Sequence, residues 1–109
     1  MKQPEAKDLL FEVMTPLRFR VEVSRSYWKL ITSVKHPVMA GHENDVKNTL
    51  QHPEQIRQSK TDSSVYLFYK AYRKGRWVCA VSKRNNREGF LITAYPTDSI
   101  KAGEKVWPK

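Results

Sequence analysis

Cysteine, glycine and histidine are scarce in this chain of 109 residues, which has one cysteine, four glycines and three histidines. The single cysteine, Cys79, excludes an intramolecular disulfide and a cysteine-rich zinc site. The four glycines form neither of the common phosphate-binding loops, GxGxxG or GxxxxGK, and no GxSxG nucleophile motif occurs. His36, His42 and His52 match no common metal-ligand spacing. We therefore expect neither a metal site nor a bound cofactor.

Long apolar runs are also absent. No stretch approaches the roughly 18 apolar residues of a membrane helix. The N-terminal sequence MKQPEAKDLLFEVM carries charges where a signal peptide needs an unbroken apolar segment. With no disulfide to form, a reducing compartment is the natural setting. We therefore expect a cytoplasmic protein that does not bind membranes.

Basic residues are what the sequence has in excess. Lysine and arginine number 20 against 11 acidic residues, which gives a net charge of +9 at neutral pH. The hydrophobic fraction of 39% is typical of a globular chain, and the length suits one domain with its own core. An excess of positive charge favours a polyanionic partner, nucleic acid before an anionic membrane surface.

The first half of the chain predicts two strands and a helix. Alternation over residues 17–23 predicts a half-buried strand, and residues 27–32 predict a second strand joined to it by a tight turn. Pro37 favours the start of the main helix, which we expect to end near Gln51. The apolar stripe of that helix comprises Met39, Val46 and Leu50, and His42 falls on it as a packed core histidine. Residues 1–16 predict either a short helix or an added edge strand.

The second half predicts an antiparallel meander with strands at residues 55–59, 65–72, 77–83 and 90–95. Residues 97–107 predict one helical turn with Ile100 and Trp107 as apolar anchors. The predicted fold class is α+β: one main helix packed on a twisted antiparallel sheet of about four strands, with an extra N-terminal β segment.

Several side chains are of the types that cleave RNA without a metal. The reaction needs a base for the 2′-hydroxyl, an acid for the leaving 5′-oxygen, and cations for the phosphorane charge. His36 lies at a predicted helix N-terminus, where backbone N–H groups favour an anion. Thr93 and Tyr95 share one face of a strand because they are two residues apart. The catalytic candidates are His36, Arg57, Ser59, Lys83, Thr93 and Tyr95.

The same residues also have purely structural interpretations. His36 before Pro37 is typical of the residue that precedes a helix, and Thr93 fits ordinary strand propensity. The basic turns at residues 73–76 and 83–87 either protect solubility or contact nucleic acid, with neighbouring tyrosines stacking on bases. The candidate nucleic-acid contacts are Lys70, Arg73, Lys74, Arg76, Arg84 and Arg87.

Short motifs in a fixed order carry a resemblance to a known superfamily. They are His36-Pro37, Thr49-Leu50, Pro53, Ile56-Arg57-x-Ser59, Val65-x-Leu67-Phe68-Tyr69, Val81-x-Lys83, Gly89-Phe90-x-Ile92-Thr93-Ala94-Tyr95 and Thr97-x-x-Ile100-Lys101-x-Gly103. Over residues 33–107 the chain resembles small prokaryotic and phage proteins of the barnase–EndoU–colicin E5/D–RelE-like nuclease superfamily.

The resemblance implies a single nuclease domain over residues 1–109, with residues 1–32 as an N-terminal elaboration. It implies metal-independent cleavage of RNA through a 2′,3′-cyclic phosphate, and a toxin neutralised by an antitoxin or immunity protein. Carried over residue by residue, His36 is the acid–base group and Arg57 a phosphate cation. Thr93 and Tyr95 orient or protonate the scissile phosphate. Ser59 and Lys83 are carried over to the same site.

Two other hypotheses stay open from the sequence. One is a non-catalytic nucleic-acid-binding module on the same fold, which keeps the basic residues but does not need His36. The other is a protein-interaction module whose basic face meets an acidic antitoxin or immunity protein and which has no intrinsic affinity for nucleic acid. The substitution His36→Ala separates the enzyme from the nucleic-acid-binding module, because only an enzyme loses turnover while keeping RNA affinity.

Overall fold

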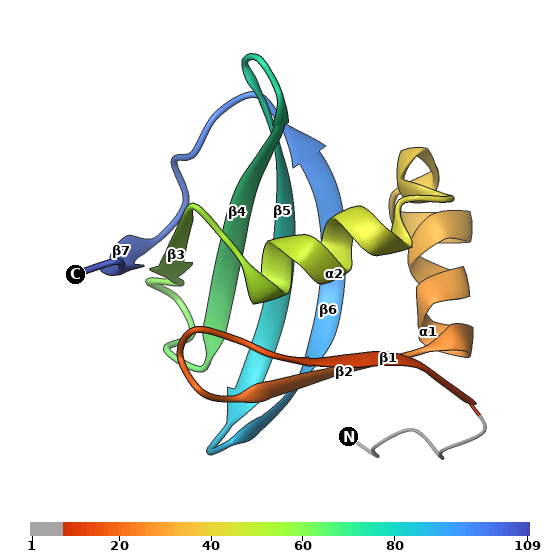
Figure 1. Ribbon diagram of the computed structural model, residues 1–109, viewed down its shortest axis with the longest axis horizontal. Helices are drawn as coiled ribbons and strands as arrows, with labels where there is room; N and C mark the ends of the chain where they lie inside the picture. The colour runs from red at the N-terminus through yellow and green to blue at the C-terminus, as the bar shows by residue number, and fades with distance from the viewer. Residues whose placement is uncertain (1–7) are drawn as a thin grey trace.

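The computed structural model describes residues 8–109, in which seven strands form one mixed sheet flanked by two short α-helices (Figure 1). The helices are α1 (Arg25–Leu30) and α2 (Glu43–Gln51). Neighbouring strands are antiparallel except β2 and β6, which run parallel, and the order across the sheet is β1-β2-β6-β5-β4-β3-β7. The strands are β1 (Leu9–Met14), β2 (Arg20–Ser24), β3 (Gln55–Gln58), β4 (Val65–Arg73), β5 (Arg76–Asn85), β6 (Glu88–Thr97) and β7 (Glu104–Trp107).

The predicted fold class, one main helix on an antiparallel sheet of about four strands, is therefore wrong. Strands β3 to β6 lie side by side, but β1 and β2 extend the sheet beyond β6 and β7 extends it beyond β3. The sheet is mixed, and α2 is only nine residues long. The added strands pair backbone groups of β3 and β6 that a four-stranded sheet leaves open at its edges.

Residues 27–32, predicted as a strand, belong instead to α1 and to a π-helical turn at Ile31–Lys35. Ser24 caps α1, because its Oγ accepts a hydrogen bond from the backbone N–H of Tyr27 at 3.0 Å. Trp28 and Ile31 lie three residues apart on the helix and are both buried. The cap and this helical spacing outweigh the strand propensity of the aromatic and β-branched residues.

The Ser24 cap makes a testable contribution to stability. We expect Ser24→Ala to lower the free energy of unfolding by about 1 kcal/mol, since an N-terminal N–H of α1 loses its acceptor. Exposed Ser33 provides a matched control, and Ser33→Ala should change stability by less than about 0.5 kcal/mol. Urea unfolding of both variants measures the difference. Equal stability of the two would show that the cap contributes nothing.

The predicted helix over residues 37–51 is interrupted. Residues Pro37–Met39 form a single 3₁₀ turn, Gly41 takes a left-handed backbone conformation with φ of 84°, and α2 begins only at Glu43. The buried stripe of Met39, Val46 and Leu50 is confirmed. His42 is not a packed core histidine, because its Nδ1 lies 2.8 Å from the Asp45 carboxylate in a half-exposed pair. Among residues 8–109, no helix has the length and apolar composition of a membrane span.

The two ends of the chain also differ from expectation. Of the alternatives for residues 1–16, the edge strand is found at Leu9–Met14, while residues 1–7 lie outside the described part. The strand predicted at 17–23 begins at Arg20, after a β1–β2 turn. The tail forms strand β7 rather than a helical turn, since pairing with β3 satisfies an otherwise open sheet edge.

The core lies between α2 and one face of the sheet. Val46 and Leu50 of α2 pack with Phe68, Ala80 and neighbouring residues, all of them buried. Figure 1 shows α2 lying across the front of the strands, while the β6–β7 connection passes behind the β4–β5 hairpin. Within residues 8–109, no α-helix covers the face turned away from α2, here called the far face. Ile100 packs against Leu67, Tyr69 and Cys79 on this face.

Candidate nucleic-acid site at the edge of strand β6

The far face collects several of the predicted site residues through strand register. Residues paired directly across strands point to the same face, as do residues two apart along a strand. One row of the far face comprises Gln55, Tyr69, Cys79 and Tyr95. The next row comprises Arg57, Leu67, Val81 and Thr93. Arg57, Thr93 and Tyr95 are thus on one face, although they come from different strands.

A π-helical turn brings His36 to the edge of this face. Thr32 Oγ1 donates to the Trp28 carbonyl at 3.0 Å, and the His36 backbone N–H bonds to the Ile31 carbonyl at 2.7 Å, five residues back. Such wide turns are frequent at functional sites. The turn places the His36 ring beside the Tyr95 ring, with centroids 5.3 Å apart and the ring planes inclined at 40°.

Two further residues, missed by the sequence analysis, lie along the same edge. Strand β2 pairs with β6 only as far as Phe90, so the Ile92 carbonyl is left without a strand partner on that side. Tyr27 Oη donates to this carbonyl at 2.7 Å, and Lys35 Nζ donates to it at 3.1 Å. Lys35 Nζ also donates to Tyr27 Oη at 2.8 Å. An ammonium has three N–H groups, so one remains for a ligand.

Five side chains thus form what we call the β6-edge cluster: Tyr27, Lys35, His36, Thr93 and Tyr95. The Thr93 hydroxyl is buried and has no hydrogen-bond partner in residues 8–109. Tyr27 escaped prediction because it was assigned to a strand. Lys35 was not predicted because the sequence gives no signal for it beyond its position next to His36.

Tyr95 packs against a buried cysteine. Cys79 is fully buried and lies between Tyr69 and Tyr95 in one row of the far face. Burial raises the pKa of Cys79 to about 11, despite an opposing effect of the Tyr69 and Tyr95 hydroxyls. Burial likewise raises the pKa of the Tyr69 and Tyr95 phenols. The Tyr95 side chain thus packs with Cys79 and lies beside the His36 ring, an arrangement that suits it to supporting His36.

This buried thiol predicts a loss of stability in alkali. The pKa of Cys79 is higher in the folded protein than the ordinary value of 9.0, so the fold favours the protonated thiol. Its stabilising contribution is fully present below pH 9 and is lost as the pH rises through about 11. We expect a decrease on the order of 2 kcal/mol over this window. Between pH 7 and 11, the free energy of unfolding should decrease less in Cys79→Ala than in the wild type. An equal decrease in the two proteins would exclude this role.

Arg57 is largely occupied by the protein itself. Its Nε donates to the Ala102 carbonyl at 2.9 Å, Nη2 to the Gly103 carbonyl at 2.9 Å, and Nη1 to Gln55 Oε1 at 3.1 Å. These bonds fasten the β6–β7 connection to β3. Three strand spacings of about 4.8 Å place the β3 and β6 backbones about 14 Å apart. Arg57 therefore does not share a phosphate with His36.

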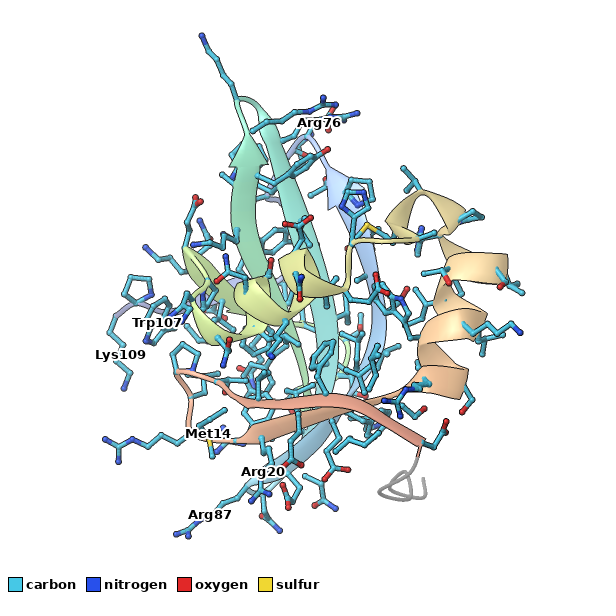
Figure 2. The ribbon with its side chains drawn as sticks, turned by 45° about the vertical axis from the view of Figure 1, so that its right-hand side comes forward. Met14, Arg20, Arg76, Arg87, Trp107 and Lys109 are labelled. Carbon is cyan, nitrogen blue, oxygen red and sulfur yellow. The ribbon has the colours of Figure 1, made fainter. Side chains whose placement is uncertain are left out.

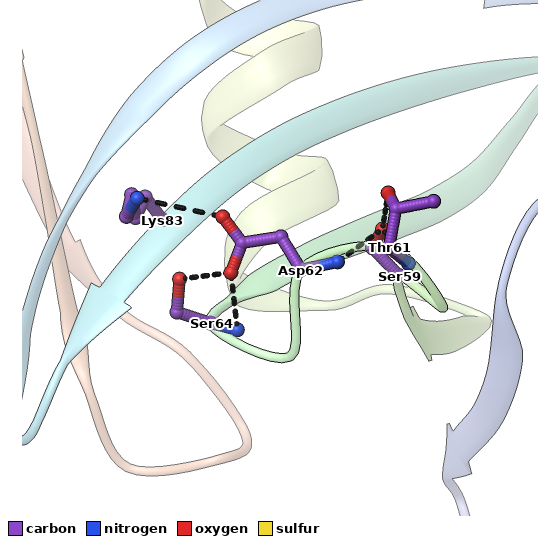
Figure 3. Close-up of polar contacts among 5 residues, drawn as sticks. All are labelled: Ser59, Thr61, Asp62, Ser64 and Lys83. Atoms are coloured by element: carbon purple, nitrogen blue, oxygen red, sulfur yellow. Dashed lines mark hydrogen bonds and ion pairs between the residues drawn. The ribbon is translucent and has the colours of Figure 1, made fainter.

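Ser59 lies in the β3–β4 loop, and Lys83 reaches that loop from strand β5, so neither belongs to the cluster (Figure 3). Ser59 Oγ accepts from the backbone N–H groups of Thr61 and Asp62 at 3.3 and 3.4 Å. Lys83 Nζ lies 3.4 Å from one Asp62 oxygen, and Ser64 donates to the other. Hydrogen bonds from Ser64 keep the pKa of Asp62 below its usual value, and Lys83 adds to this effect.

The predicted nucleic-acid contacts are spread over the molecule. The β4–β5 turn carries Arg73, Lys74 and Arg76, whereas the β5–β6 turn carries Arg87 with Arg84 beside it. Figure 2 shows Arg76 and Arg87 at opposite ends of the molecule. Lys70 lies apart from both turns, and its Nζ donates to the His52 carbonyl at 2.9 Å. The basic residues of the two turns therefore form two separate groups, one at each end of the molecule, rather than one continuous patch.

The cluster offers an acid–base group, a cation and hydroxyls, but no set of metal ligands. Within residues 8–109, no three His, Cys, Asp or Glu side chains lie close enough together to hold a metal ion. The resemblance to the nuclease superfamily stays a prediction from short motifs. Comparison with known proteins gives no match: no family model, no curated protein and no solved structure is significantly similar to this chain.

Proposed function

We propose that this protein is a metal-independent endoribonuclease that cleaves RNA at the β6-edge cluster. The observation that carries the proposal is the His36 ring held 5.3 Å from the Tyr95 ring of β6, while the Lys35 ammonium binds the Ile92 carbonyl of the same strand. Histidine is the side chain whose proton exchanges most readily near neutral pH. A fixed cation stabilises charge that develops on a phosphate. The net charge of +9 and the ordered motifs support the same function.

The proposed reaction is an internal transesterification. His36 accepts the proton of a ribose 2′-hydroxyl, and the 2′-oxygen attacks the adjacent phosphorus. The bond from phosphorus to the 5′-oxygen breaks, and this oxygen takes a proton from water or from the imidazolium. The products are a 2′,3′-cyclic phosphate and a 5′-hydroxyl, so no net oxidation or hydrolysis occurs in this step.

The other cluster residues have supporting roles in this proposal. The third N–H of Lys35 Nζ binds a non-bridging phosphate oxygen while the other two hold the Ile92 carbonyl and Tyr27. The Thr93 hydroxyl is buried and therefore does not contact the phosphate. Tyr95 fixes the plane of the His36 ring. The β3 backbone that carries Arg57 lies about 14 Å from β6. The Arg57 guanidinium has two N–H groups left for a phosphate further along the RNA strand.

The test is an RNA cleavage assay with purified protein in excess EDTA. Transfer RNA, ribosomal RNA and ribosome-bound message are offered as substrates, because the cluster does not specify which of them is cut. We expect at least one to be cleaved at a rate that EDTA does not change. Intact RNA in all three reactions would reject the proposal.

We further propose that the activity serves as a toxin in the cytoplasm, restrained by an antitoxin or immunity protein. Induced expression in a bacterial host should then arrest growth and produce RNA fragments with cyclic-phosphate ends. The His36→Ala variant should restore growth at an equal protein level. Equal growth of both strains would count against toxicity, and arrest by both would move the site away from His36.

A non-catalytic RNA-binding module is the second candidate, and one observation favours it. Arg76 and Arg87 lie at opposite ends of the molecule, and Arg57 and Lys83 already have protein partners, so positive charge is not concentrated around the cluster. Such a module binds RNA through salt-sensitive phosphate contacts. Its affinity should be the same in the wild type and in His36→Ala, and it should release no RNA fragments.

A further inference from the structure

An open pocket at the lower end of the sheet has no part in the β6-edge cluster. It has a volume of about 310 Å³ and is lined by Ser63, Ser64, Tyr66, Arg84 and Asn86. A water molecule occupies roughly 30 Å³ of liquid, so the pocket admits a much larger group. The β3–β4 loop and the β5–β6 turn form its walls, and the Arg84 backbone N–H holds them together through the Ser64 carbonyl at 2.8 Å.

The Arg84 guanidinium is held in place before any ligand arrives. Its Nε donates to the Asn86 carbonyl at 2.7 Å, and its carbon lies 5.1 Å from the centre of the Phe19 ring. In the part of the chain that the structure describes, neither terminal amino group of Arg84 has an acceptor. A guanidinium with a fixed plane and free terminal amino groups is suited to a phosphate, whose oxygens it binds in pairs.

Three neutral groups of the pocket can each donate a hydrogen bond to a ligand. Tyr66 Oη accepts from Gln58 Nε2 at 3.3 Å, so its own proton is available. The Ser63 hydroxyl and the Asn86 amide have no partner among residues 8–109. No carboxylate of residues 8–109 lines the pocket. The charge of nearby Asp62 is offset by Lys83, as Figure 3 shows. Donors around one fixed cation select an anion.

We infer that this pocket binds a phosphodiester of single-stranded nucleic acid, as a second phosphate subsite remote from the point of cleavage. The inference rests on the proposed ribonuclease function, which supplies the nucleic acid. Lys83 and Arg84 are adjacent on β5 and point to opposite faces, so the pocket opens at the rim of the sheet rather than on the far face. A bound strand therefore extends past the cluster toward this end of the molecule.

The first arm of the test measures binding of a 12-nucleotide single strand that carries 2′-deoxyribose throughout and therefore cannot undergo the proposed cleavage. Fluorescence anisotropy over a range of salt concentrations compares the wild type with Arg84→Gln. We expect a three- to tenfold loss of affinity and a salt slope reduced by about 0.7, the value of one phosphate contact. Lys60→Gln, which removes one positive charge from the exposed β3–β4 loop without touching the pocket lining, is the matched control. Equal effects of the two variants would overturn the inference.

The second arm uses inorganic phosphate as the probe and avoids reliance on Arg84, whose loss also disturbs Phe19. Backbone NMR shifts of Ser63, Ser64 and Asn86 should move with added phosphate in the wild type. The double variant Ser63→Ala, Asn86→Gly removes two donors and keeps a residue that tolerates the φ of 60° at position 86. It should weaken both phosphate and oligonucleotide binding. Shifts with phosphate but unchanged oligonucleotide binding would overturn the inference in favour of a free-phosphate site.

Failure of the subsite and failure of the proposed function give different results. RNA cleavage by the wild type, combined with identical binding by Arg84→Gln and Lys60→Gln, rejects the pocket and leaves the nuclease. Loss of binding specific to Arg84→Gln, without any RNA cleavage by the wild type, retains the pocket and rejects the nuclease.

Discussion

Replacing His36 with alanine should lower kcat for RNA cleavage by about 10²–10⁴-fold, the usual contribution of a positioned general base. The ring is partly exposed, and its described side-chain contact is the neighbouring Tyr95 ring. Its removal should therefore leave the fold intact. RNA affinity should change by less than about threefold, because phosphate contacts from lysines and arginines dominate binding. Single-turnover cleavage combined with anisotropy separates the two quantities.

His52→Ala is the matched control for this experiment. His52 is an exposed histidine that ends α2, and its described contacts, with Asn48 and Lys70, use its backbone groups. The variant should cleave RNA at the wild-type rate. Equal loss of activity in both variants would indicate a general effect on the fold. Full activity in His36→Ala would remove His36 from the mechanism.

Gly103→Ala should destabilise the protein more than Gly75→Ala. Gly103 has a φ of 78°, which costs an alanine about 1–2 kcal/mol. A Cβ atom at this position would also lie 2.5 Å from the Gln58 carbonyl oxygen, a backbone atom that cannot swing away. Overpacking of this kind typically adds about 1–3 kcal/mol. We expect a total loss of about 2–5 kcal/mol and a displaced Gly103 carbonyl, which Arg57 would no longer reach.

Gly75→Ala isolates the steric part of this effect. Gly75 has nearly the same φ, 74°, but a Cβ there meets nothing within 4 Å. Its cost should be limited to the backbone strain of about 1–2 kcal/mol. Denaturant unfolding of the two variants gives the difference directly. Equal destabilisation would mean that the close approach of Gly103 to β3 is not tight in solution.

The central strands were predictable because their signals are local. Residues 65–72 and 77–83 are rich in aromatic and β-branched types and are separated by a compact turn, and both lie within strands of the sheet. Residues 27–32 have the same composition, yet they are helical. There a single capping bond from Ser24 and the burial of Trp28 and Ile31 decide the outcome. Composition alone does not distinguish the two cases.

The extent of the sheet was not predictable, because it depends on contacts distant in sequence. Strand β7 exists because β3 offers an open edge and Arg57 fastens the preceding segment. The parallel pairing of β2 with β6 joins residues more than 60 positions apart, such as Arg20 and Glu88. Neither strand pairing can be recognised from a pattern in the sequence of the paired strands themselves.

The candidate site was visible only in part. Alternation along one strand correctly placed Thr93 and Tyr95 on one face, and register shows that Arg57 shares it. The proximity of His36 to Tyr95 depends on a π-helical turn that Thr32 helps to form, which the sequence does not signal. The role of Lys35 depends on an unpaired carbonyl at Ile92, which only the full sheet reveals.

The chemistry of the cut ends tests the central claim most directly. RNA cleaved by the wild-type protein in EDTA is mapped, and a second oligonucleotide carries 2′-deoxyribose only at the mapped position. The β6-edge mechanism predicts 2′,3′-cyclic phosphate and 5′-hydroxyl ends on the first substrate, by mass spectrometry, and no cleavage of the second at that position. Cleavage of the deoxy-substituted substrate there, or 5′-phosphate ends on the first, would contradict a reaction that starts from the 2′-hydroxyl.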